Sequence, residues 1–86
     1  MRLWGKIIKD GHLVRDIVAE NLSDDTRTHK ILYSLDEICQ ELDLPRPIWL
    51  DKNIADFKRN AKTKFTQDSF IEHIEFDAFE IQIIEE

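Results

Sequence analysis

Apolar and β-favouring residues alternate with polar ones in two runs near the start of the chain, residues 3–8 and residues 13–19. Between the runs stand Asp10 and Gly11, the dipeptide that best tolerates positive φ angles at both central positions of a type I′ turn. The pattern therefore predicts a β-hairpin over residues 3–19.

The register of this hairpin follows from the position of the turn. A two-residue turn places Ile8 opposite Leu13 and, two residues further along, Lys6 opposite Arg15. Like charges in directly opposed positions destabilise a strand pair. A longer loop or a β-bulge near the turn therefore stays open as an alternative register.

The strongest periodic pattern of the chain is helical. Residues 23–26, Ser-Asp-Asp-Thr, offer several capping side chains and carboxylates suited to the positive end of a helix dipole. Leu44-Pro45 predicts the end of the helix, because the residue before proline avoids the α region. The alternative is a strand over residues 27–33. We favour the helix because the following positions form one apolar stripe: Ile31, Leu32, Leu35, Ile38, Cys39 and Leu42.

The middle of the chain predicts an extended segment and a second, shorter helix. Residues 47–51 are too short to stand alone and predict an extended piece or edge strand on the core, with Trp49 as an anchor. Asn53 and Asp56 have the spacing of a capping box, which predicts a helix from Asn53 onward. Its narrow apolar side includes Phe57, and we expect Phe65 to close the same cluster.

The last part of the chain has two alternating apolar sets that are out of phase: Ile74 and Phe76, then Phe79, Ile81 and Ile83. The extra residue between them predicts a bulge or a bend. We expect the second set to pair with the strand that begins near Leu3.

The predicted fold is a single α+β domain over residues 1–86, with the N-terminal hairpin and the C-terminal strand in one sheet. One long amphipathic helix packs on that sheet, beside a second short helix.

Composition narrows the class of protein further. The 86 residues are 42% apolar and include only two Gly and two Pro, which excludes disordered and low-complexity classes. The apolar runs are far shorter than the roughly 20 residues that span a bilayer, and the start lacks a secretory signal. The single cysteine, Cys39, cannot form an internal disulfide. We therefore expect a cytoplasmic protein that makes no membrane contact.

Charge is distributed unevenly along a chain whose net charge is −6. Residues 44–65 contain six Lys or Arg against two Asp or Glu, whereas residues 66–86 contain seven acidic residues and no Lys or Arg. Basic residues beside Phe57 and Phe65 suit phosphate-backbone binding and base stacking, so a nucleic-acid-associated regulator is one alternative. The overall acidity favours a solvated helix face instead. The candidate interaction surface comprises Trp4, Trp49, Lys58, Arg59, Lys62 and Lys64.

The acidic end of the chain supports a second alternative. Carboxylates alternate with apolar residues over residues 72–86 and could imitate a phosphate ladder, which suggests an inhibitor of a nucleic-acid-binding protein. The simpler interpretation is the solvent face of an amphipathic strand, whose charges also protect a sheet edge from aggregation.

No constellation of catalytic or metal-binding residues is visible in the sequence. Two glycines cannot form a glycine-rich phosphate loop, and His12, His29 and His73 fall on three different elements. Cys39 lies on the apolar stripe of the long helix, where an inert thiol is expected. We therefore expect no catalytic residue, cofactor or metal. The predicted role is a non-catalytic module that binds a protein partner or itself, through a sheet edge or the Trp4 and Trp49 surfaces.

Three segments together resemble a known group of proteins: residues 47–53, residues 57–65 and residues 70–86. They resemble a family of short proteins from Gram-positive, largely anaerobic bacteria that has no assigned activity. The resemblance covers nearly the whole chain. It implies a free-standing bacterial cytosolic domain, and it transfers no functional residue.

Overall fold

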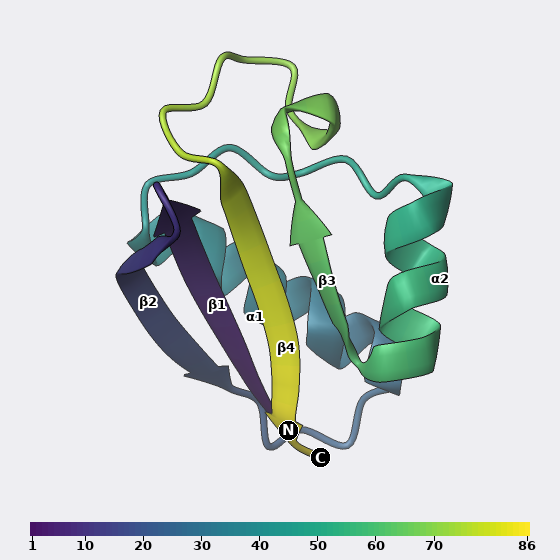
Figure 1. Ribbon diagram of the computed structural model, residues 1–86. Helices are drawn as coiled ribbons and strands as arrows, with labels where there is room; N and C mark the ends of the chain where they lie inside the picture. The colour runs from purple at the N-terminus through teal and green to yellow at the C-terminus, as the bar shows by residue number, and fades with distance from the viewer.

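A computed structural model describes residues 1–86 and contains one antiparallel sheet with two helices packed on it (Figure 1). The strand order is β2-β1-β4-β3, and both chain ends lie at the same end of the sheet. This arrangement confirms the predicted α+β fold class. In chain order the elements are β1 (Arg2–Lys9), β2 (His12–Glu20), α1 (Arg27–Glu41), α2 (Asp51–Asn60), β3 (Lys62–Phe65), the 3-10 helix η1 (Gln67–Ser69) and β4 (Ala78–Glu85).

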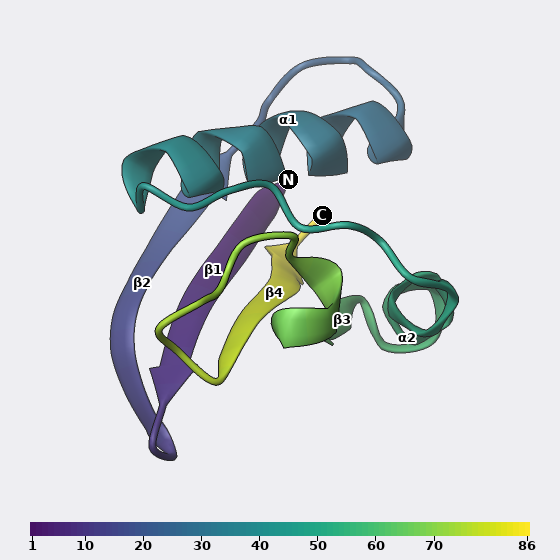
Figure 2. The same cartoon turned by 90° about the horizontal axis from the view of Figure 1, so that it is seen from above.

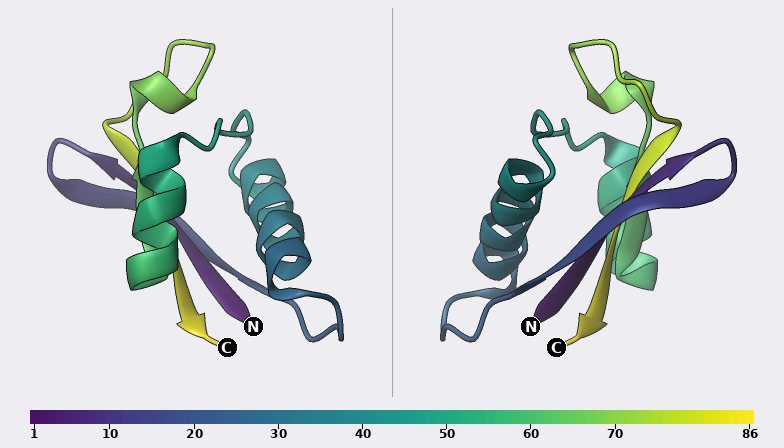
Figure 3. Two further views of the ribbon diagram at one scale, coloured as in Figure 1. Left: turned by 90° about the vertical axis from the view of Figure 1, so that its right-hand side faces the viewer. Right: turned by 90° about the vertical axis from the view of Figure 1, so that its left-hand side faces the viewer.

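The two helices occupy different places relative to the sheet. Helix α1 runs across one face, and α2 lies beside β3 at the edge of the sheet (Figures 1 and 2). Residues 42–50 cross without regular secondary structure from the end of α1 to the start of α2. The opposite face of the sheet carries no helix, and the β1–β2 turn projects toward that side (Figure 3).

The predicted hairpin turn is present. Asp10 and Gly11 have φ angles of 54° and 77°, the positive values that a type I′ turn requires at both positions. Asp77, just before β4, holds the turn: its carboxylate accepts a hydrogen bond from the Asp10 N–H at 2.7 Å, and its own N–H donates to the Ile8 carbonyl at 2.9 Å. The bend predicted before the C-terminal strand therefore also supports the hairpin.

The hairpin contains the β-bulge that the sequence left open. Ile8 lies opposite Leu13 as expected, but the register then shifts between Ile7 and Ile8. After the shift Lys6 lies opposite Asp16 rather than Arg15. The bulge therefore replaces a pair of like charges by a pair of opposite charges, which is the favourable cross-strand arrangement.

Helix α1 begins where the capping residues predicted it. The hydroxyl of Thr26 accepts a hydrogen bond from the His29 N–H at 3.2 Å, and the strand considered for residues 27–33 is absent. The helix ends at Glu41, before Leu44-Pro45: Asp43 has φ 56° and the Leu44 N–H donates to the Cys39 carbonyl at 2.8 Å. This left-handed cap, rather than the proline, ends the helix.

The segment from residue 51 to residue 65 differs from the helix predicted from Asn53 onward. Helix α2 begins at Asp51 and ends at Asn60, Ala61 turns the chain with φ 55°, and Lys62–Phe65 form β3 beside β4. The reason is a change of period: Thr63 and Phe65 are both buried and lie two residues apart, as on a strand. The basic residues expected on one helix face are therefore divided between α2 and β3.

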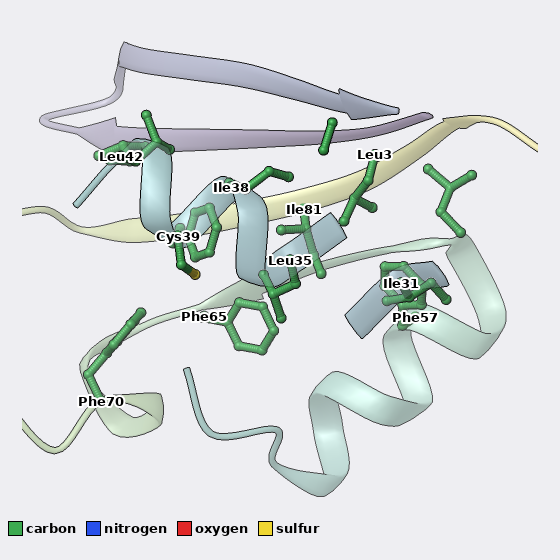
Figure 4. Packing of buried hydrophobic residues seen from close by; sticks show 14 of the residues in the cluster. Leu3, Ile31, Leu35, Ile38, Cys39, Leu42, Phe57, Phe65, Phe70 and Ile81 are labelled. Atoms are coloured by element: carbon green, nitrogen blue, oxygen red, sulfur yellow. The ribbon is translucent and has the colours of Figure 1, made fainter. Parts of the chain in front are cut away.

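β4 is a central strand that joins the two halves of the sheet. It pairs with β1, as predicted, and also with β3. Its inward side chains meet α1 and form the middle of the hydrophobic core (Figure 4). Helix α1 packs closely over Gly5, where an added Cβ would stand 2.6 Å from Ile38 Cγ2. The core contains, among others, Leu3, Ile7, Leu35, Ile38, Phe65, Phe79 and Ile81.

Candidate functional site

An open groove of about 270 Å³ lies between the N-terminal half of α1 and helix α2. Figure 4 shows Ile31 beside Phe57, where the two helices approach each other. Most of the groove wall is apolar, and its two charged side chains are both cationic. We call it the interhelical groove; its lining residues are Arg27, Thr28, Ile31, Leu32, Trp49, Ile54, Phe57 and Lys58.

The groove exists because the apolar stripe of α1 is wider than one face. Adjacent residues project about 100° apart on an α-helix, so Ile31 and Leu32 cannot both face the sheet. Ile31 is buried, whereas Leu32 remains 42% exposed toward the groove. Across the groove, Ile54 of α2 is 41% exposed. Two large aliphatic side chains therefore stay half in solvent on facing helices.

Trp49 contributes the aromatic surface of the groove. Its ring packs edge-to-face against Phe57 and Phe65, with centroid distances of 5.5 and 5.1 Å, which confirms the predicted anchor. The indole Nε1 is buried and has no hydrogen-bond acceptor. Buried tryptophan donors usually find a partner, so this one is an unused polar group beside an apolar wall.

Helix α2 is fixed against the sheet by a buried amide. The Asn53 side chain donates to Thr63 Oγ1 and to the Lys64 carbonyl, both at 2.9 Å, and accepts from the Leu50 N–H at 3.1 Å and from Ser69 Oγ at 3.4 Å. Asn53 was expected only as a helix cap, but it ties α2 to β3 and η1. These bonds hold one wall of the interhelical groove in place.

The charge of the groove is positive. Arg27 Nε lies 3.3 Å from one carboxylate oxygen of Glu86, and Arg27 Nη2 lies 3.4 Å from the other. Both side chains are half-exposed, so this pair is weak. Lys58 is exposed and forms no ion pair. No acidic residue lines the groove.

The open sheet face holds a different set of polar residues. Lys6 Nζ lies 2.7 Å from a carboxylate oxygen of Glu80 and 4.0 Å from the centroid of the Trp4 ring. Trp4 Nε1 donates to Asp16 at 2.8 Å, and Lys64 Nζ lies 4.0 Å from Glu80. Glu80 is only 6% exposed, so the expectation of a solvated acidic strand face is wrong at this position. This face is a network of charges that neutralise one another.

The structure divides the surface predicted from the sequence. Trp49 and Lys58 line the interhelical groove. Lys62 and Lys64 alternate with the buried residues of β3 and share the open sheet face with Trp4, and Arg59 lies on α2 outside the groove. The sequence did not single out Arg27, and it placed Leu32 only on the apolar stripe of the long helix and Ile54 only on the apolar side of the short one. The width of the stripe on α1 was the available indication that Leu32 belongs elsewhere.

A second hollow, of about 410 Å³, lies at the other end of α1. Its wall mixes both signs of charge, including Lys9, Asp43, Glu72 and Glu75, and Arg15 already donates to the Leu42 carbonyl at 3.2 Å. Its charges favour neither an anion nor a cation. The interhelical groove, whose only charged lining residues are cations, is the hollow whose charge favours one kind of partner.

Outside the groove, the residues that could carry catalytic or metal chemistry are Cys39 and the scattered His, Asp and Glu side chains. Cys39 is buried in the core, and this burial raises the pKa of its thiol to about 11. No three His, Cys, Asp or Glu residues are grouped where they could hold a metal ion, and neither helix has the length and apolar character needed to cross a membrane.

Comparisons with protein-family models, with curated proteins and with solved structures find no match.

Proposed function

We propose that this chain is a non-catalytic, cytoplasmic interaction module that binds an apolar segment of a protein partner in the interhelical groove. The observation that carries the proposal is that Leu32 of α1 and Ile54 of α2, each more than 40% exposed, line the same hollow together with Trp49. Aromatic residues and fully desolvated apolar pockets are typical of binding hot spots. The fold gains little from leaving these side chains in water.

The arrangement of α1 and α2 supports a preformed site. Each wall of the groove belongs to a helix that is fixed independently, α1 by the core and α2 by the buried hydrogen bonds of Asn53. A partner would therefore meet a surface that needs no refolding. Preorganisation of this kind lowers the free-energy cost of binding.

The nucleic-acid alternative has weaker support. The four basic residues that suggested it lie on two elements, and Lys64 is directed to Glu80. Trp4, the aromatic residue on the same face, is engaged by Asp16 and Lys6. Base stacking needs a free aromatic face next to unpaired cations. An inhibitor that presents a phosphate-like ladder is likewise disfavoured, because Glu80 is buried between two lysines.

Site-specific photo-crosslinking in the native host tests the proposal. A photoreactive phenylalanine analogue at position 54 lies in the groove, and the same analogue at position 13 is a matched control, since Leu13 is exposed on the hairpin. We expect a discrete protein adduct from position 54 alone. Equal adducts from both positions, or none from position 54, would contradict the assignment of the groove. Adducts to nucleic acid from position 64 would favour the alternative.

A further inference from the structure

The interhelical groove has a charge opposite to that of the chain that contains it. The chain has 18 acidic residues against 12 basic ones, yet the wall of the groove has two cations, Arg27 and Lys58, and no acid. The second hollow of the molecule mixes both signs. The charge of the groove is therefore a local property and does not follow from composition.

The walls of the groove restrict the form of a partner. Except for Trp49, the residues that line the groove belong to helices α1 and α2. A β-strand partner needs an extended row of free backbone N–H and C=O groups, which the side of a helix does not present, whereas a helix binds through side chains spaced along one face. The groove therefore suits a helix better than an extended peptide.

We infer that the partner segment is an acidic amphipathic helix. Its apolar face would contact Leu32, Trp49 and Ile54, and its carboxylates would pair with Arg27 and Lys58. This inference rests on the proposed function and specifies the chemistry of the partner. Complementary charge of this kind selects the partner and its orientation, while the apolar contacts provide most of the affinity.

The end of the chain bears on the same site. The Glu86 carboxylate lies on Arg27 at 3.3 and 3.4 Å, where a partner carboxylate would bind. Glu86 is therefore an internal competitor for one of the two cations. Glu85 is an ideal control, because it carries the same charge one residue away and makes no ion pair with Arg27.

The test measures Trp49 fluorescence in a Trp4→Phe protein, so that the only indole lines the groove. Two designed helical peptides of about 20 residues, long enough to be helical, have the same apolar face but carry either Glu or Lys on its flanks. At low salt we expect the acidic peptide to bind at least about 10-fold more tightly than the basic one. The preference should shrink as salt screens the exposed charges.

Charge variants locate the preference in the groove. Lys58→Glu should abolish the preference for the acidic peptide, whereas Arg59→Glu, with the same charge change on the neighbouring residue outside the groove, should retain it. Glu86→Gln should strengthen binding of the acidic peptide by about 2- to 5-fold, the effect of releasing one exposed ion pair. Glu85→Gln should not.

The possible results are distinguishable. Equal binding of the two peptides, or a preference for the basic one, would overturn the inference and leave the groove as an apolar binding site. No binding of either peptide at about 1 mM would overturn the proposed function as well. If the free protein self-associates in analytical ultracentrifugation, and Leu32→Ser with Ile54→Ser abolishes this, the occupant is a second copy and the inference is wrong.

Discussion

Leu32 and Leu35 lie one turn apart on α1, yet they belong to two different regions of the molecule. Leu35 is 3% exposed and packs in the core between α1 and the sheet, whereas Leu32 is 42% exposed beside the interhelical groove. Both belong to the apolar stripe seen in the sequence. The difference teaches that a helix stripe wider than one face supplies two surfaces, one packed in the core and one left open to solvent.

The core region should be sensitive to truncation. Leu35→Ala removes a fully buried side chain from between α1 and the sheet, and we expect a loss of about 2 to 5 kcal/mol in unfolding free energy. Urea unfolding followed by circular dichroism measures this loss. A loss below about 0.5 kcal/mol, the range of surface substitutions, would contradict the packing of α1.

Helix α2, which forms one wall of the interhelical groove, is held in place by the buried side-chain amide of Asn53. Asn53→Ala removes the partner of the buried Thr63 hydroxyl and of the part-buried Lys64 carbonyl, and an unsatisfied buried group costs about 1 to 3 kcal/mol. We therefore expect a loss of at least about 1 to 3 kcal/mol in urea unfolding, with faster hydrogen exchange in α2. Asn60→Ala is the control, since Asn60 is exposed at the end of the same helix. Equal losses for the two variants would show that Asn53 does not fix α2.

Gly5 leaves no room for a side chain between the sheet and α1. Gly5→Ala places a methyl group 2.6 Å from Ile38 Cγ2 and 3.2 Å from Phe79 Cε1, so the Ile38 side chain or the helix that carries it must shift. Overpacking of this kind costs about 1 to 3 kcal/mol. The cost should be smaller when Ile38 is already Ala, which a double-mutant cycle detects. Additive losses would mean that the clash is relieved in another way.

The buried thiol of Cys39 makes the stability of the core region depend on pH. Burial raises the pKa of its thiol from 9.0 to about 11, so the folded protein retains a proton that the unfolded chain releases. Unfolding free energy should therefore fall as pH rises from about 9 to 11, and the contribution is fully present below pH 9. The fall should be smaller in Cys39→Ala. Identical pH profiles for the two proteins would show that the thiol is not buried.

Much of the core region was predictable because its signals are local. The dipeptide at Asp10 and Gly11 defines the turn, the conflict between Lys6 and Arg15 points to the bulge, and the period of α1 defines its buried stripe. The pairing of β4 with β1 followed from its apolar alternation. β3 was missed because a four-residue strand directly after a helix carries too few positions to establish a period of two.

The groove was less predictable because it depends on tertiary structure. Trp49 and Lys58 were selected separately, one as an anchor and one as a cation, and Arg27 was not selected. The three meet only because residues 42–50, which lack regular secondary structure, bring α2 alongside the start of α1. Sequence periodicity describes single elements, and it does not report how two helices approach each other.

The stability of a groove variant tests the central claim most directly, namely that the apolar residues of the groove are there for a partner and not for the fold. Leu32→Ser combined with Ile54→Ser changes two half-exposed side chains. We predict that unfolding free energy falls by less than about 1.5 kcal/mol in urea, because surface substitutions have small effects. A loss as large as that of Leu35→Ala would contradict the claim, since the groove would then be part of the core.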